Sequence, residues 1–163
     1  MKIKKIIARK ILDSLGNDAI EVIVNKKYSC SAPNEIIKEN HSFYPYKNDL
    51  NDTIHSINNS KQLKKIEINN FSDLYYLDNL RDELGANGMY ALHGAILKAL
   101  SNNEVWRFLN SHPDKMPIPI GNCIGGSIDG RNNVDFREFL VIPKTMDFID
   151  GVFANEYVYK RIG

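Results

Sequence analysis

Residues 118–143 read IPIGNCIGGSIDGRNNVDFREFLVIP, and they carry the clearest strand, glycine loop and strand pattern in the chain. An apolar run over 118–124 is closed by two glycines, and a polar, turn-prone segment follows over 129–133. A second run, 134–142, is rich in β-branched and aromatic residues and stops at Pro143. The pattern predicts two β-strands joined by a loop.

Glu138 lies inside the second of these runs, between Arg137 and four apolar residues, so it is predicted to sit in a buried strand. An ionised carboxylate in such a place costs free energy unless it is paired or hydrogen-bonded. An ion pair, with Arg137 of a neighbouring copy or with a nearby lysine, is one explanation. A catalytic role for the carboxylate is the other explanation.

The same stretch resembles the segment that opens the barrel of enolases, which reads roughly N-x-x-G-G-x-H-A-x-N-N-x-D-x-Q-E-F-x-x-x-P. The matching residues are Gly126, Asn132, Asn133, Asp135, Glu138, Phe139 and Pro143. The family histidine falls on Asp129, and the second glycine falls on Ser127. The resemblance implies that Glu138 is a catalytic carboxyl group and that Asp129 replaces a catalytic histidine.

The first 32 residues predict a three-stranded antiparallel meander. Residues 19–24 (AIEVIV) alternate, with Ile20, Val22 and Val24 on one face, and a glycine turn separates them from an apolar run over 3–12. Tyr28–Ala32 is the expected third strand.

This region also resembles enolases, whose N-terminus reads A-R-x-x-x-D-S-R-G-N-P-T-V-E-V. The matching residues are Ala8, Arg9, Asp13, Ser14, Gly16, Asn17, Glu21 and Val22, followed later by Leu84, Gly85, Ala86 and Asn87. In the family, a loop after the third strand supplies a serine ligand to Mg²⁺. Here that position falls on Ile37, which has no oxygen for a hard cation. Mg²⁺ is therefore implied by the resemblance alone, and the sequence identifies no metal-binding or cofactor-binding residue.

Helical spacing predicts helices near 48–59, 72–83 and 87–100. The last of these has an expected buried stripe of Met89, Leu92, Ile96, Ala99 and Leu100. His55 and His93 lie off the apolar stripes and are predicted to be surface residues, and His41, Tyr44 and Tyr46 are predicted to pack in a surface loop. Trp106, Phe108 and Leu109 are expected to continue a packing segment. A helix over 146–159 has an apolar face, formed by Phe148, Ile149, Val152, Phe153 and Tyr157. This face is expected to be exposed in the chain alone, and residues 118–159 are expected to be buried against another protein.

Composition excludes several classes of protein. The 163 residues carry a net charge of +1, without the basic stripe that nucleic acid binding requires and without an apolar run that would span a membrane. Cys30 and Cys123 lie far apart, outside any metal-ligand spacing, which indicates reduced thiols in a cytoplasmic protein.

Together these features predict an α+β fold in two parts. Residues 1–112 are expected to form an enolase-like N-terminal domain with a three-stranded antiparallel meander and helices. Residues 113–163 are expected to form the first two strands and first helix of an enolase-type barrel. A whole barrel takes about 250 residues, so this segment is expected to be incomplete.

By resemblance, the expected function is that of an enolase-type lyase, which dehydrates 2-phosphoglycerate to phosphoenolpyruvate in glycolysis. The chain alone is expected to be inactive, and to need either a complementing barrel chain or a second copy of itself as partner. The small phosphorylated substrate is expected only in the completed form. The matches at Arg9 and Glu21 fall where family members form part of a dimer contact. The alternative is a non-catalytic, enolase-like binding or assembly module.

Overall fold

The computed structural model describes residues 3–34, 44–112, 114–125 and 138–162, and their contacts divide the chain into two compact units, Met1–Ser111 and His112–Gly163. The elements of the first unit are β1 (Ile6–Leu12), β2 (Asp18–Val24), β3 (Tyr28–Ala32), α1 (Leu50–Asn59), the 3₁₀ helix η1 (Phe71–Leu80), α2 (Arg81–Leu100) and α3 (Val105–Leu109). Those of the second are β4 (Gly121–Gly125), β5 (Glu138–Val141) and α4 (Phe148–Ile162).

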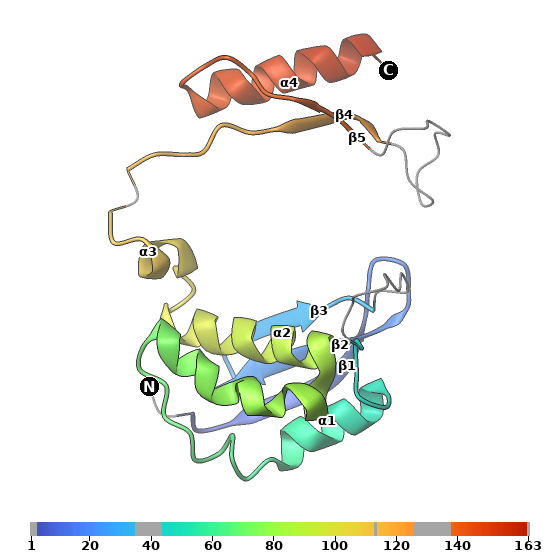
Figure 1. Ribbon diagram of the computed structural model, residues 1–163, viewed down its shortest axis with the longest axis vertical. Helices are drawn as coiled ribbons and strands as arrows, with labels where there is room; N and C mark the ends of the chain where they lie inside the picture. The colour runs from blue at the N-terminus through green and yellow to red at the C-terminus, as the bar shows by residue number, and fades with distance from the viewer. Residues whose placement is uncertain (1–2, 35–43, 113, 126–137, 163) are drawn as a thin grey trace. The chain divides into compact units, whose positions relative to one another are not determined.

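The first unit has the predicted three-stranded antiparallel sheet, in the order β1-β2-β3 (Figure 1). The expected alternation along β2 is confirmed, because Ile20, Val22 and Val24 have no exposed surface. The fold class is thus α+β, with the arrangement expected of an enolase-like N-terminal domain.

Asp13 organises the turn between β1 and β2. Its carboxylate accepts hydrogen bonds from the amides of Asn17 at 2.8 Å and Leu15 at 2.9 Å. These bonds, chiefly the one from Asn17, hold the pKa of Asp13 below its usual value. Gly16 completes the turn with a φ of 81°, in the left-handed region that favours glycine.

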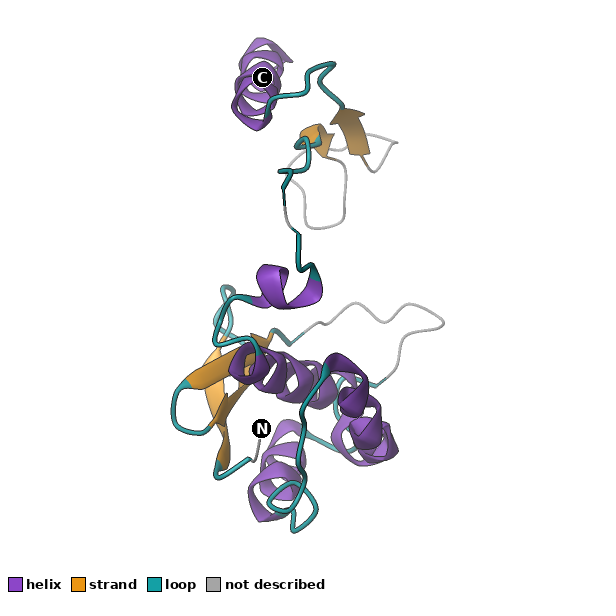
Figure 2. Ribbon diagram, turned by 90° about the vertical axis from the view of Figure 1, so that its left-hand side faces the viewer, coloured by secondary structure: helices purple, strands orange, loops and turns teal. Residues whose placement is uncertain are grey.

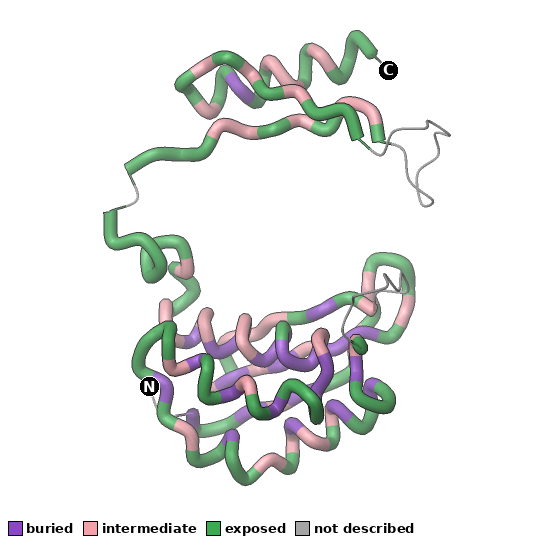
Figure 3. Tube along the Cα trace, in the orientation of Figure 1, coloured by how far each residue is buried: buried purple, intermediate pink, exposed green. Residues whose placement is uncertain are grey.

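Helices α1 and α2 pack on one face of the sheet, which Figure 2 shows edge-on beside them. The predicted stripe on α2 is confirmed for Met89, Leu92, Ile96 and Ala99, which are buried, while Leu100 is half-buried. Figure 3 shows buried positions both along the strands of this sheet and along the helices that cover it.

The helix predicted at 72–83 differs from the observed one in type and in extent. Residues 71–80 form the 3₁₀ helix η1, and α2 begins directly after it at Arg81. Leu74, Leu77 and Leu80 are all buried, and at three residues per turn their spacing of three residues stacks them directly above one another. Asn70 and Asp73 form a capping box at its start.

The C-terminal end of α2 is tied back to the turn between β2 and β3. Asn102 Oδ1 accepts hydrogen bonds from Lys27 Nζ at 3.1 Å and from the Tyr28 hydroxyl at 2.7 Å. Helix α3, which follows, has no buried residue. The expectation that Trp106, Phe108 and Leu109 continue a packing segment was therefore wrong, because all three are exposed.

In the second unit, β4 and β5 pair antiparallel, with Gly121 opposite Val141 and Gly125 opposite Glu138. A register shift between Asn122 and Ile124 leaves one extra residue on β4. Helix α4 packs along β4.

The apolar face of α4 is exposed, as expected for the chain alone. Within this unit only Gly151 is buried among the described residues, and Phe153 is 61% exposed. The helix instead approaches β4 through small and polar residues: Gly151 lies against Pro119, and Asn155 lies against Gly121. None of the helices in the described ranges combines the length and apolar character needed to cross a bilayer.

Candidate functional site

Glu138 is the first residue of β5 and pairs with Gly125 at the end of β4. The prediction that it lies in a buried strand was wrong, because Glu138, Phe139 and Leu140 are all exposed. No ion pair or hydrogen bond joins the Glu138 side chain to another residue of the described parts of the chain. The carboxylate is therefore exposed and has no ion-pair partner within these residues.

Asp129, the other predicted catalytic residue, lies outside the described residues, as do Arg137 and Ile37. Of the two predicted site residues the structure therefore describes Glu138 alone, and their pairing stays a prediction.

The hairpin that carries Glu138 is held by helix α4. Asn155 Nδ2 donates a hydrogen bond of 2.9 Å to the carbonyl oxygen of Pro119, just before β4. A Cβ atom at Gly121 would lie 2.7 Å from the Asn155 side chain, so glycine is needed for this approach. Asn155 thus fixes the start of β4 against the helix, a role that the apolar pattern of α4 did not predict.

In the first unit, the residues Leu84–Asn87 anchor the backbone on both sides of residues 35–43. The Ala86 amide donates to the carbonyl of Tyr44, and the Asn87 amide donates to that of Pro45, both at 2.9 Å. The Asn87 side chain donates to the carbonyl of Pro33 at 2.8 Å. The L-G-A-N residues therefore position the two ends of the segment in which the resemblance places the Mg²⁺-binding loop.

A magnesium ion does not fit the residues that the structure describes. They contain no group of three or more His, Cys, Asp or Glu side chains arranged to hold a metal. Arg9 and Glu21, both matched in the resemblance, pair with each other across β1 and β2, with Nε and Oε2 2.5 Å apart.

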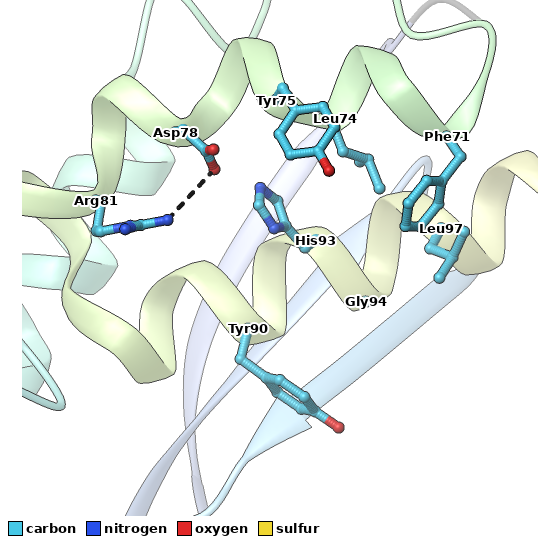
Figure 4. A pocket seen from close by; sticks show the side chains of 9 residues that line it. All are labelled: Phe71, Leu74, Tyr75, Asp78, Arg81, Tyr90, His93, Gly94 and Leu97. Carbon is cyan, nitrogen blue, oxygen red and sulfur yellow. Dashed lines mark ion pairs between the residues drawn. The ribbon is translucent and has the colours of Figure 1, made fainter. Parts of the chain in front are cut away.

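A cavity of about 480 Å³ lies between η1 and α2 (Figure 4). His93 of α2 points toward η1 there and is half-buried, with its Nε2 atom buried and without a hydrogen-bond partner among the described residues. Burial lowers the pKa of His93 below its usual value. The prediction of a surface histidine was thus wrong, whereas His55 is exposed as expected.

Comparison with known proteins gives relatives over almost the whole chain. The chain is 30% identical over 187 residues to the enolase of Picrophilus torridus, covering 99% of this chain and 44% of that protein. It is 31% identical over 179 residues to the enolase of Methanothermobacter thermautotrophicus, with coverages of 98% and 43%. The chain is enolase-like. No protein-family model matches it.

The enolase-like similarity is distributed along the chain. The enolase of Ehrlichia ruminantium is 27% identical over 188 residues, again covering 99% of this chain and 45% of the relative. The chain therefore spans less than half the length of the enolases it matches. The similarity includes both units, and with them the hairpin of Glu138 and the L-G-A-N residues.

Proposed function

We propose that residues 1–163 supply the N-terminal domain and the first barrel strands of an enolase-type lyase, which dehydrates 2-phosphoglycerate to phosphoenolpyruvate. The observation that carries this proposal is the similarity to enolases over 98–99% of the chain, in both units. The α+β fold of the first unit supports it. In this proposal residues 1–112 are the N-terminal domain and residues 113–163 belong to the barrel.

Glu138 is proposed to act in proton transfer during departure of the hydroxide, as one member of a carboxyl pair. Its exposure and its lack of an ion-pair partner in the described ranges leave the carboxylate available to a substrate. The lysine base, the partner carboxylate and the ligands of Mg²⁺ are proposed to lie outside residues 1–163. The described residues themselves contain no cluster of side chains that fits the metal.

A polypeptide of these 163 residues alone is proposed to be inactive, and to work with the remainder of a barrel on the same or another chain. Exposed apolar side chains of the second unit support this; they are Ile120, Phe139, Leu140, Ile142, Ile149, Val152, Phe153 and Tyr157. A cytoplasmic location belongs to the same proposal, in keeping with the free thiols of Cys30 and Cys123.

A chimera tests this function. Residues 1–163 are joined to the part of the M. thermautotrophicus enolase that follows its matched segment, and enol product is followed by absorbance with 2-phosphoglycerate and Mg²⁺. We expect activity in the chimera and none in residues 1–163 alone. Glu138→Gln is expected to lower the rate about 10²–10⁴-fold. The matched control, Asp150→Asn, removes an exposed carboxylate of α4 and is expected to leave the rate unchanged.

The alternative function, a non-catalytic enolase-like module, is favoured by the replacement of the loop serine by Ile37 and of the family histidine by Asp129. The chimera separates the two. Activity gained only with Ile37→Ser and Asp129→His would show that these replacements silence the natural chain. A folded, active chimera whose rate is unchanged by Glu138→Gln would contradict the role of Glu138.

A further inference from the structure

Strand β3 lies at one edge of the three-stranded sheet, with β2 on one side and no further strand of the described residues on the other. In an antiparallel pair, the backbone groups of alternate residues point to the same side of the strand. The carbonyl oxygen of Ser29 points away from β2, because it accepts a hydrogen bond of 2.7 Å from Lys98 Nζ of α2. The backbone N–H and C=O of Ser31, two residues later, therefore also point outward.

Two side chains of α2 close this outer edge at its two ends. Lys98 occupies the carbonyl of Ser29, and Asn87 Nδ2 donates to the carbonyl of Pro33 at 2.8 Å, just beyond the strand. Pro33 has no N–H, so it cannot continue a strand ladder. A lysine and a proline at an edge are two of the devices by which natural sheets avoid pairing with another chain.

Ser31 is the outward-facing residue between these two ends, and it is exposed. Its carbonyl has a weak contact of 3.9 Å with the thiol of Cys30. Ser31 alone allows one hydrogen-bonded residue pair between two copies of the chain. If the carbonyl of Ser29 were also free, the two residues would allow two such pairs, with four backbone hydrogen bonds.

We infer that the outer edge of β3 is a surface for pairing with a second copy of this chain, and that Lys98 keeps it closed. A two-fold axis at Cys30 places Ser29 of each copy opposite Ser31 of the other, so the edge is complementary to itself. Lys98 opposes this pairing in two ways: it occupies the Ser29 carbonyl, and it brings like charges of the two copies together. The pairing involves the first unit alone and does not rest on the proposed lyase function.

The test measures the distance between β3 strands of different molecules with a nitroxide label on Ser31→Cys. Cys30→Ala and Cys123→Ala remove the other thiols, and Phe153→Ser removes an exposed ring of α4. In the inferred register the two labelled Cα atoms lie about 8 Å apart, from the strand rise and spacing. Lys98→Met keeps the length of the side chain but removes its N–H donors and its charge.

We expect the Lys98→Met protein to lose more than half of its central-line amplitude in the electron paramagnetic resonance spectrum as its concentration is raised. Dilution with unlabelled Lys98→Met protein should restore the amplitude, because the broadening is intermolecular. The labelled chain with Lys98, and the conservative variant Lys98→Arg, should both keep their full amplitude. The control Ile96→Val lowers stability in the core of α2 without changing the edge, and should also keep it.

The inference is overturned if the folded Lys98→Met protein keeps its amplitude, or if its broadening survives dilution with unlabelled protein. Equal broadening in the chain with Lys98, in Lys98→Arg or in Ile96→Val overturns it too, because the edge would then not be closed by this side chain. Circular dichroism verifies that each variant is folded. Should Lys98→Met not fold, Lys98→Leu decides by the same criteria.

Discussion

Asn87 Nδ2 donates a hydrogen bond of 2.8 Å to the carbonyl oxygen of Pro33, which lies 54 positions earlier in the sequence. The amide of the same residue donates to the carbonyl of Pro45 at 2.9 Å. Asn87 therefore holds the chain on both sides of residues 35–43, through its side chain at Pro33 and through its backbone amide at Pro45. Asn87 belongs to the L-G-A-N motif shared with enolases. Its hydrogen bonds to Pro33 and Pro45 give this residue a structural role that involves no contact with substrate.

Replacing Asn87 by alanine is expected to lower the free energy of unfolding by about 0.5–1.5 kcal/mol, the usual net contribution of one hydrogen bond. Urea unfolding followed by circular dichroism measures the change. The control is Asn51→Ala, an exposed position of α1 whose side chain makes no hydrogen bond in the described parts of the chain. Equal stabilities for the two variants would show that the contact to Pro33 contributes nothing.

Replacing Gly85 by alanine is expected to be considerably more damaging. Gly85 has a φ of 69°, and a Cβ atom there would lie 2.6 Å from the carbonyl oxygen of Pro45. Backbone strain alone costs about 1–3 kcal/mol, and the steric overlap adds to it. The matched control is Gly16→Ala, with a φ of 81° and open space around the new atom. Thermal unfolding should show the larger loss for Gly85→Ala, and similar losses would refute the clash.

His93 is expected to make the fold less stable as the pH falls. Burial chiefly lowers its folded-state pKa; Asp78, which faces the imidazole, partly offsets this, and Arg81 adds to it. Below the unfolded-state pKa of about 6.5 the unfolded chain takes up a proton that the folded chain resists, so stability falls until the folded pKa is reached. Above that range the contribution is constant.

Unfolding free energies between pH 8 and pH 5 test this expectation, with His93→Phe as the comparison. The decline should be smaller in the variant. Asp13 and Asp73, whose pKa values are lowered by backbone hydrogen bonds, act in a separate and more acidic range: their stabilisation is lost as the pH falls below 3.8. Parallel pH profiles for wild type and variant would rule out the role assigned to His93.

The contact between Gly94 and Cys30 predicts a compensating pair of substitutions. A Cβ atom at Gly94 would overlap the Cys30 sulfur and lie 3.0 Å from the Cys30 Cβ. Gly94→Ala is expected to destabilise the chain by about 1–3 kcal/mol through overpacking. Cys30→Ala removes the sulfur, so the double variant should recover most of this loss in a double-mutant cycle. Additive losses would show that the two residues do not couple.

The exposed apolar face of α4 is expected to make the 163-residue chain associate in solution. Light scattering at tens of micromolar should give a mass above that of the monomer, and Phe153→Ser should reduce it, because Phe153 is largely exposed. Leu15→Ser, at a single exposed residue of the β1–β2 turn, is the control and should change nothing. A monomeric wild-type chain would contradict the expectation.

The sheet and the stripe of α2 could be predicted because each follows a simple period. Ile20, Val22 and Val24 repeat every second residue, and Leu92 and Ile96 are separated by one helical turn. The spacing of Leu74, Leu77 and Leu80 fits one face of an α-helix as well as one face of a 3₁₀ helix, so the sequence pattern alone could not distinguish η1 from an α-helix.

Periodicity could not predict which side of α4 contacts β4, nor the cavity between η1 and α2. Helix α4 contacts β4 through Gly151 and Asn155, and neither residue contributes to an apolar pattern. His93 lies off the apolar stripe of its own helix, and only the approach of η1 buries it. Glu138 was found by resemblance, and its exposed place at the start of β5 follows from the hairpin.

The link from Asn102 to Lys27 and Tyr28 has a consequence for the order of events during protein synthesis. The sheet strands leave the ribosome first, but the helix that covers their apolar face ends at Leu100, and the residue that ties it down comes two positions later. Until then Ile20, Val22 and Val24 lack the part of their cover that α2 provides. Once Asn102 has emerged, every residue of the first core is available, and that unit can close before the hairpin of Glu138 has been translated.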